Sequence, residues 1–332
     1  MTIVFFGELL LRLSSPGREL LLQSPRLDVC VGGAEANVAV GLASLGHSVR
    51  MVSAVPDNAL GRAAVSTIRG HGADVSGVQT LAGRMGLYFL APGAGLRASE
   101  IVYDRAGSSF ATAPADAFDW PALLQGASRL HLSGITPALG PATSAAAIAA
   151  AEAAAAAGVP VSFDGNYRAK LWEAWDSDPK SVLTTLIGHA DILFGNHRDI
   201  SLLLGTQFSG DGSERRREAA EAAFAAFPKL EVIASTARHV DDADSHRVAA
   251  RIDTRAEWHQ TEEAQIAGIV DRIGAGDAFA AGVLHGLPGG IRAAAESGLA
   301  LTALKHSLPG DMSLFRQADI DAFLEGGFDV RR

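Results

Sequence analysis

The sequence DRIGAGDAFAAG, residues 271–282, has two glycines separated by one alanine, then an aspartate and a run of small apolar residues. The apolar run is typical of a helix, and the glycines predict a tight turn at its start. A glycine-rich turn that opens a helix presents unobstructed backbone N–H groups, which usually bind an anion such as phosphate. The carboxylate of Asp277 therefore stands where a second negative charge is expected to bind.

Two interpretations of this carboxylate are open. Asp277 caps the helix in the first, because aspartate is a favoured capping residue. In the second, the backbone amides of residues 275–277 stabilise the charge that develops on a transferring phosphoryl group. Asp277 then takes the proton of the attacking hydroxyl during the transfer, since a carboxylate is too weak a base to remove it beforehand. The second interpretation explains why an acid lies beside a phosphate site.

The rest of the chain alternates short aliphatic runs with helical stretches. We expect buried strands at residues 2–6, 49–54, 129–133, 159–164, 192–194 and 231–235, and helices at residues 36–45, 60–69, 141–157, 181–187 and 214–226. This alternation predicts βαβ units, and hence an α/β fold in which helices cover both faces of a mainly parallel, Rossmann-like sheet. Ligands of such sheets bind beyond the carboxyl ends of the strands.

The segment from residue 75 to residue 103 interrupts this alternation. RMGLYFLA (84–91) and SEIVYDR (99–105) have the pattern of strands, and the turn-rich PGAGLRA joins them. Because these strands do not fit a parallel sheet, we expect a small separate sheet that forms a lid over the active site. We therefore predict one domain, 1–332, with lid strands mainly from residues 8–32 and 75–105.

Charge and cysteine content exclude several classes of partner. The net charge of −9 argues against nucleic acid and against an anionic membrane surface, which both need clustered Lys and Arg. Cys30 is the only cysteine, which rules out an intramolecular disulfide and indicates a reducing compartment. The first residues lack the basic segment of a signal peptide. We expect a cytoplasmic protein.

The usual nucleotide-binding signatures are missing. The chain has no G-x-x-x-x-G-K-[ST], and no G-x-G-x-x-G follows the first strand. These absences exclude a P-loop protein and argue against a dinucleotide-dependent oxidoreductase. The ten histidines show neither H-x-H nor H-E-x-x-H spacing, so a histidine-rich metal site is not expected.

Two further segments carry candidate site residues. In VGGAEAN, from Val31, Gly32 and Gly33 allow close approach of the backbone, and Asn37 offers a side-chain contact near a helix start. A plain junction between a loop and a helix is the alternative. In SFDGNYR (162–168), the polar residues after the strand face the ligand side of the sheet. Arg168 there can pair with a carboxylate or a phosphate, or form a surface ion pair.

The three tyrosines lie in the lid segment or beside this strand end, at Tyr88, Tyr103 and Tyr167. Tyr103 is two residues from Arg105 on a predicted lid strand. An aromatic hydroxyl and a guanidinium on one strand suit a polyhydroxylated acid as the ligand.

Together GGAEAN, the lid strands, DGNYR, GNHRD and GAGDAFAAG resemble the ribokinase-like (PfkB) carbohydrate kinases over nearly the whole chain. GAGD before an apolar helix is the most specific of these motifs. Within that family, FGELLLRL, GGAEAN, GLYFL and YDRAGSSFA are most similar to 2-keto-3-deoxygluconate kinases. The resemblance implies the ribokinase-like fold, with a small β-sheet lid, and ATP and Mg²⁺ as cofactors.

The resemblance also implies roles for individual residues. Asp277 is the base, and Gly274, Ala275 and Gly276 form the anion hole. The implied sugar-binding residues are Gly32, Gly33, Asn37, Tyr88, Tyr103, Arg105, Asn166, Arg168 and Asp277. The nucleotide is implied to contact Asn196, Thr236, Arg238, Gly274 and Gly276. Asp199 replaces the glutamate of the family pattern N-x-x-E and is implied to reach the metal through water.

We therefore expect a kinase that transfers the γ-phosphoryl group of ATP to the terminal hydroxyl of 2-keto-3-deoxygluconate. One alternative is a fructokinase or ribokinase that acts on a neutral sugar. Another is a non-catalytic protein that senses a sugar or a nucleotide. The gluconate- and galactonate-derived acids differ at one stereocentre, which the sequence does not distinguish. The unpaired edges of a lid sheet favour a homo-oligomer.

Overall fold

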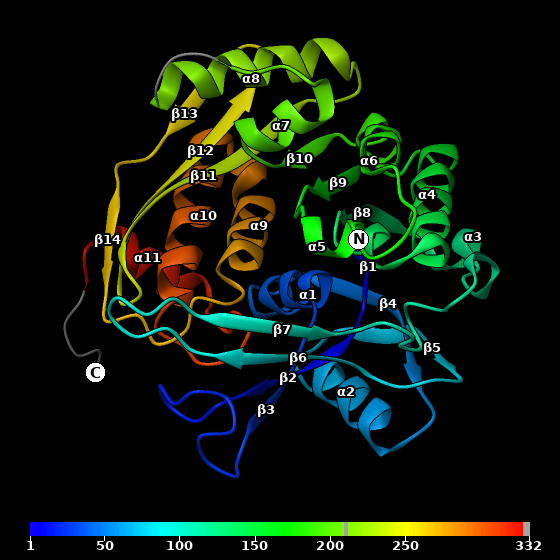
Figure 1. Cartoon of the computed structure of the whole chain (residues 1–332). Helices are drawn as coiled ribbons and strands as arrows, with labels where there is room; N and C mark the ends of the chain where they lie inside the picture. The colour runs from blue at the N-terminus through cyan, green and yellow to red at the C-terminus, as the bar shows by residue number, and fades with distance from the viewer. Residues whose placement is uncertain (209–211, 328–332) are drawn as a thin grey trace.

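The structure is a computed structural model that describes residues 1–208 and 212–327. One large sheet runs through the molecule, and a small sheet lies along one side of it (Figure 1). Nine strands of the large sheet follow the order β13-β12-β11-β10-β9-β8-β1-β4-β5, and β14 pairs with β12. All pairs from β11 to β5 are parallel, whereas β12 is antiparallel to its neighbours. This architecture confirms the predicted α/β fold.

The strands of the large sheet include all six that were predicted. Their bounds are β1 Thr2–Phe6, β4 Ser48–Pro56, β5 Asp74–Leu81, β8 Ala127–Ser133, β9 Val161–Asp164, β10 Ile192–Phe194, β11 Val232–Asp242, β12 Ser245–Thr254, β13 Trp258–Gln260 and β14 Ala264–Ala267. β11 is longer than the predicted strand of residues 231–235, because residues 236–242 continue it. They pair with β12 in a hairpin, and residues 238–241 of the β11 arm are exposed, which explains their polar sequence.

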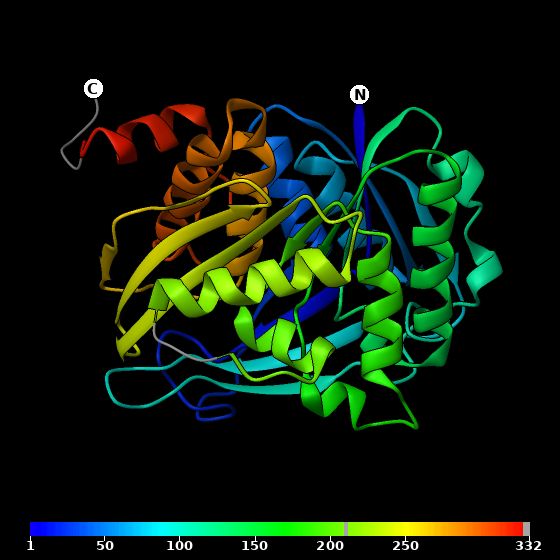
Figure 2. The ribbon, with the colours of Figure 1, turned by 90° about the horizontal axis from the view of Figure 1, so that it is seen from above.

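Helices cover both faces of this sheet, as Figure 2 shows from above. The first face carries α1 Ala34–Ser44, α2 Ala59–Gly70, α9 Ala275–Gly286, α10 Ile291–Lys305 and α11 Gln317–Leu324. The second face carries α3 Trp120–Leu123, α4 Pro141–Ala156, α5 Ala169–Trp172, α6 Pro179–Gly188, α7 His197–Leu204 and α8 Gly212–Ala226. Side chains of a strand alternate between the faces. Accordingly Phe5 packs into the first core, and Val4 and Phe6 pack into the second.

The small sheet is the predicted lid. Its strands are β2 Leu10–Ser14, β3 Asp28–Gly32, β6 Gly86–Ala91 and β7 Glu100–Asp104, in the order β3-β2-β6-β7. The predicted range of 75–105 was too wide, because residues 74–81 form β5 at the edge of the large sheet, parallel to β4. Figure 1 shows β6 and β7 crossing the molecule below α1.

Across the described residues, we find no helix with both the length and the apolar character that a membrane span requires.

Candidate active site

A cavity of about 870 Å³ lies between the lid and the carboxyl ends of β9, β10 and β11. It is lined by most of the predicted site residues: Gly33, Asn37, Tyr88, Tyr103, Arg105, Asn166, Arg168, Asn196, Asp199, Thr236, Arg238, Gly274, Gly276 and Asp277. Gly32 and Ala275 are not part of the lining. Gly32 packs against the side chain of Asp311, and the amide of Ala275 donates to the carbonyl of Arg272 at 3.3 Å.

The turn before α9 has the geometry of an anion site. Gly274 has a φ of 80°, and an added Cβ would collide with the carbonyl oxygen of Asp311, so both conformation and space require glycine there. The first helical hydrogen bond runs from the amide of Ala278 to Gly274, at 2.8 Å. The amides of Gly276 and Asp277 therefore have no helical acceptor. No side chain caps this helix.

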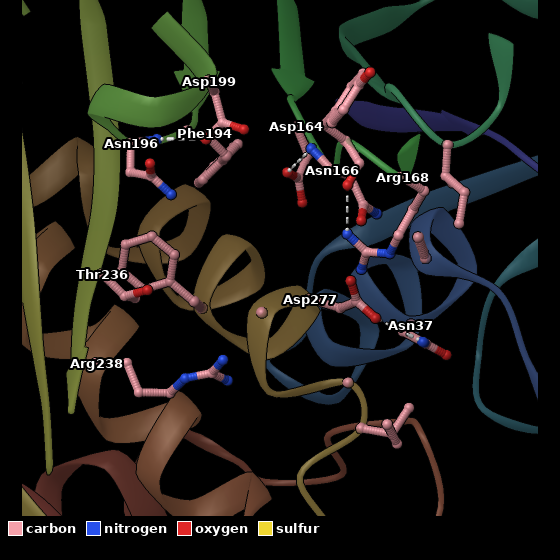
Figure 3. A pocket seen from close by; sticks show the side chains of 18 of the residues that line it. Asn37, Asp164, Asn166, Arg168, Phe194, Asn196, Asp199, Thr236, Arg238 and Asp277 are labelled. Atoms are coloured by element: carbon pink, nitrogen blue, oxygen red, sulfur yellow. Dashed lines mark hydrogen bonds between the residues drawn. The ribbon is translucent and has the colours of Figure 1, made fainter. Parts of the chain in front are cut away.

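The side chain of Asp277 faces the cavity. Its Oδ2 accepts a hydrogen bond from Nδ2 of Asn37, at 2.7 Å, although 240 residues separate the two in sequence. Figure 3 shows the two side chains meeting between α9 and α1. The interpretation of Asp277 as a helix cap is therefore wrong. Burial raises the pKa of Asp277 to about 8, the bond from Asn37 partly opposes this, and the charge of Asp164 adds to it.

The lid contributes two paired aromatic side chains. Tyr88 and Tyr103 are register partners on β6 and β7, with ring centroids 6.2 Å apart. The Tyr88 hydroxyl donates to Oδ2 of Asp311 at 2.7 Å, which fixes the ring at the cavity wall. Tyr103 is more exposed, at 36%, and lines the same cavity.

The two predicted arginines differ in their surroundings. Arg105 is buried, and its Nε donates to Oε2 of Glu8 at 2.6 Å. Sequence reasoning missed Glu8, which lies two residues after the end of β1 and 97 positions from its partner. Arg168 is bound only locally, because its guanidinium donates to the carbonyl of the adjacent Tyr167 at 3.1 Å. Arg168 is therefore the guanidinium more available to an acidic ligand.

Two carboxyl groups lie together at the ends of β9 and β10. Burial raises the pKa of Asp164 to about 7, and the nearby charge of Asp199 raises it further. Burial also raises the pKa of Asp199, although Asp199 accepts from the amide of Asn196 at 2.7 Å. A hard cation would relieve the repulsion of two such carboxylates, and oxygen ligands suit Mg²⁺.

These residues fit Mg²⁺ as a partial set of ligands. Within residues 1–208 and 212–327, no group of three or more His, Cys, Asp or Glu side chains could hold a metal ion. Mg²⁺ usually binds one or two carboxylates and takes its remaining ligands from phosphates and water. Asp164 and Asp199 supply that number.

The opposite side of the cavity is basic. Thr236 and Arg238 project from β11, across the cavity from Asp277 and Arg168 (Figure 3). Burial lowers the pKa of Arg238, and the charge of Arg272 lowers it further. Arg216 from α8 also lines this side. Sequence reasoning gave no role to Arg216 or Arg272, although clustered guanidinium groups suit a polyphosphate.

The sequence matches the model of the pfkB family of carbohydrate kinases over residues 2–314. This chain belongs to the PfkB family. The PfkB chain is 32% identical over 329 residues to the 2-dehydro-3-deoxygalactonokinase of Haloferax volcanii, which covers 98% of this chain and 97% of that relative. A crystal structure of the 2-dehydro-3-deoxygluconokinase of Thermotoga maritima has a TM-score of 0.92 and 36% identity, over 98% of both chains.

Other PfkB kinases bind ATP and Mg²⁺. One solved structure, described as a ribokinase II of E. coli in complex with ATP and Mg²⁺, has a TM-score of 0.81 over 98% of this chain and 99% of that one, at 18% identity. At this identity the likeness shows a shared fold. Membership of the family identifies the PfkB chain as a carbohydrate kinase, a phosphotransferase with an alcohol acceptor.

Proposed function

We propose that this protein is an ATP- and Mg²⁺-dependent kinase that phosphorylates the terminal hydroxyl of 2-keto-3-deoxygluconate to the 6-phosphate. The observation that carries the proposal is that Arg168 and the lid tyrosines line the same cavity as Asp277. Arg168 lies within electrostatic range of Asp164 and Asp199. An acidic sugar gives it a further carboxylate as partner, whereas a neutral sugar offers it no charged group. The names of the Thermotoga maritima and Haloferax volcanii relatives support a keto-deoxy sugar acid.

In the proposed mechanism, the hydroxyl of the sugar lies beside Asp277, which accepts its proton as the phosphoryl group transfers. The amides of Gly276 and Asp277 stabilise the charge that develops on that group. Arg238 and Arg272 hold the polyphosphate on the far side of the cavity. Asp164 and Asp199 would hold Mg²⁺, which neutralises phosphate charge. Asn196, Thr236 and Gly274 complete the proposed nucleotide contacts.

An ATP-consumption assay across sugars and sugar acids tests this function. The panel contains 2-keto-3-deoxygluconate, 2-keto-3-deoxygalactonate, fructose and ribose. We expect the highest kcat/KM with a keto-deoxy acid, and the ratio between the two acids decides the stereochemistry. A preference for fructose or ribose would contradict the proposal. Turnover with no member of the panel would favour a sensing role.

Arg168→Ala tests recognition of the carboxylate. A charge-assisted hydrogen bond contributes about 1.5–3 kcal/mol, so kcat/KM for the keto acid should fall about 10- to 150-fold. The loss for a neutral sugar should be much smaller. Equal losses on both would favour the neutral-sugar alternative. Arg105→Ala is a less specific test, because it leaves the buried Glu8 without its partner and should destabilise the fold.

The Arg105–Glu8 pair is the one observation that favours a neutral sugar. Glu8 already pairs with Arg105, one of the two arginines that were expected to bind the carboxylate of an acidic ligand. Measuring kcat/KM of wild type and Arg168→Ala with both an acidic and a neutral sugar decides between the two substrate classes. Only an acidic sugar has a carboxylate to pair with the Arg168 guanidinium.

We also propose that the protein forms a cytoplasmic homo-oligomer through its lid. All five residues of β7 are exposed, and Val29 on the other edge strand is 59% exposed. Apolar side chains on unpaired edges suit pairing with a second copy. Light scattering should show a dimer or larger assembly, and Val102→Lys should weaken it. A monomer at high concentration would contradict the proposal.

A further inference from the structure

The turn before α9 is held by a carboxylate that joins two loops. Oδ1 of Asp271 accepts from the amide of Ile273 at 3.0 Å, and Oδ2 accepts from the amide of Gly310 at 3.1 Å. Ile273 directly precedes Gly274. Asp271 therefore links the segment that leads into α9 to the segment around residue 310.

Asp311 makes the second link. Its carbonyl oxygen lies so close to Gly274 that no side chain fits there, and its own side chain is 3% exposed. Oδ2 of Asp311 accepts from the hydroxyl of Tyr88. One residue of this loop thus touches both the anion-binding turn and a lid side chain that lines the cavity.

Arg12 connects both carboxylates to the lid. It lies on β2, where its register partner on β6 is Tyr88. One terminal nitrogen of Arg12 is 2.7 Å from Oδ2 of Asp271, and the other is 2.8 Å from Oδ1 of Asp311. The Arg12 side chain is 6% exposed. A buried guanidinium between two buried carboxylates has few alternative positions.

Lys305 completes the charge balance of this cluster. Its side chain is fully buried, and its Nζ donates to the carbonyl of Leu308 at 2.9 Å. It lies within electrostatic range of Asp271 and Asp311. Two cations therefore face two carboxylates. The cluster as a whole is neutral, and removing one member leaves a buried charge without a partner.

We propose that Arg12 is a positioning residue that transmits the position of the lid to the anion-binding amides of α9. The proposal rests on the proposed role of those amides in phosphoryl transfer. Arg12 does not line the 870 Å³ cavity but a smaller one of about 370 Å³ beside it, so it reaches the anion site through Asp271 and Asp311 and not by contact with the sugar or nucleotide. A sugar that contacts Tyr88 then orders the same carboxylates that hold Gly274. Sugar binding should therefore strengthen nucleotide binding, and the reverse by the same factor.

The chain offers a matched control in Arg18. It follows β2 and forms an ion pair with Asp244, in the turn of the β11–β12 hairpin. This pair also ties the lid region to the large sheet, but Arg18 is 48% exposed and contacts neither loop of the anion site. Comparing Arg12 with Arg18 separates coupling through the buried cluster from attachment of the lid in general.

The experiment compares wild type, Arg12→Lys, Arg12→Met and Arg18→Met, with the best sugar of the panel. For Arg12→Met we expect kcat to fall at least tenfold, while the Kd of the sugar measured without nucleotide changes less than threefold. Arg12→Lys keeps the charge but cannot span both carboxylates, so it should recover part of kcat. Calorimetry with Mg-ADP, with and without saturating sugar, should show at least fivefold tighter binding with sugar in wild type. This factor should fall below twofold in Arg12→Lys and stay unchanged in Arg18→Met.

Normal kcat and full coupling in Arg12→Lys would overturn the proposal, as would equal losses in Arg18→Met or no coupling in wild type. Arg12→Lys decides the matter if Arg12→Met does not fold. Gly276→Val tests the anion site at the start of α9 separately from the positioning role of Arg12. An inactive Gly276→Val beside normal Arg12 variants refutes only the positioning role. A fully active Gly276→Val refutes the anion site on which that role rests.

Discussion

Two helices begin at the wall of the same cavity, and they satisfy their first backbone amides differently. In α7, Asn196 accepts from the amide of Arg198 at 2.8 Å, and Asp199 accepts from the amide of Asn196. In α9, a glycine occupies the N-cap position and no side chain caps the helix. Each helix has an aspartate in its first turn. One carboxylate oxygen of Asp199 accepts from a backbone amide at the start of its own helix. Asp277 instead accepts from the side chain of Asn37, which is distant in sequence, and faces the cavity.

The difference shows that an uncapped helix start is what leaves amides and an acid available for chemistry. A capped start uses the same residue types to stabilise its own helix. The two aspartates therefore should respond differently to substitution, and the following predictions test that contrast.

Asp277→Asn should have the largest effect. The amide accepts no proton, so kcat should fall about 10²- to 10⁴-fold while nucleotide binding changes little. Steady-state kinetics and calorimetry with Mg-ADP measure the two quantities. Turnover near the wild-type level would remove Asp277 from the mechanism and erase the contrast between the two helices.

Gly276→Val tests the amides of the uncapped helix. An added Cβ at Gly276 meets no other atom of the protein within 4 Å, so the fold should tolerate the change. Its side chain would stand where the phosphate approaches, and kcat/KM for ATP should fall about 10²-fold. Thermal melting checks that the variant is folded. A folded variant with normal kinetics would place the anion site elsewhere.

The dependence of activity on pH should follow the free acid. The pKa of Asp277 is raised to about 8, so the group is protonated, and inactive as a base, below that pH. We expect kcat/KM to rise about tenfold per pH unit up to about pH 8 and then level off. The profile of the free enzyme, measured with saturating Mg²⁺, checks this. A profile that is flat from pH 6 to pH 8 would contradict the assigned base.

Asp199→Ala should have the smallest effect on turnover. It removes half of the capping pair of α7, which should lower the free energy of unfolding by about 0.5–2 kcal/mol. Loss of a carboxylate near Mg²⁺ should reduce kcat only a few-fold at saturating metal. Urea unfolding and a Mg²⁺ titration measure these effects, with Asp199→Glu as the control that keeps an acid. If Asp199→Ala lowered kcat as much as Asp277→Asn, the predicted difference between the starts of α7 and α9 would be wrong.

The sequence predicted most of what lies along short stretches of chain. The turn at Gly274, the strand end at Asp164 and the helix that follows Gly33 can each be inferred from adjacent residues. Asn37, which was predicted to contact the sugar, lines the cavity, but its bond to Asp277 could not be foreseen across 240 positions. The same holds for the ion pair of Glu8 and Arg105, since nothing local marks either residue as a partner.

Other errors arose where local composition opposed the tertiary context. Residues 238–241 of β11 are exposed and mostly polar, and such a pattern is typical of a loop. The two glycines predicted a tight turn without showing which of them has the unusual backbone angle, and the positive φ belongs to Gly274. Residues 74–81 contain a glycine and alternate in polarity, yet they pair with β4 because an edge strand buries only part of its surface.

The position of β1 has a consequence for synthesis of the chain on the ribosome. β1 precedes the other strands of this sheet in sequence, but it lies inside the sheet between β4 and β8. Ile3 can pair with Val49 soon after β4 emerges from the ribosome. Its pairing with Arg129 on β8 must wait for a further 80 residues. At roughly 5–20 residues per second, one edge of β1 stays open for several seconds. During that interval the apolar edge of the nascent sheet is a site where chaperones, or neighbouring nascent chains, can bind.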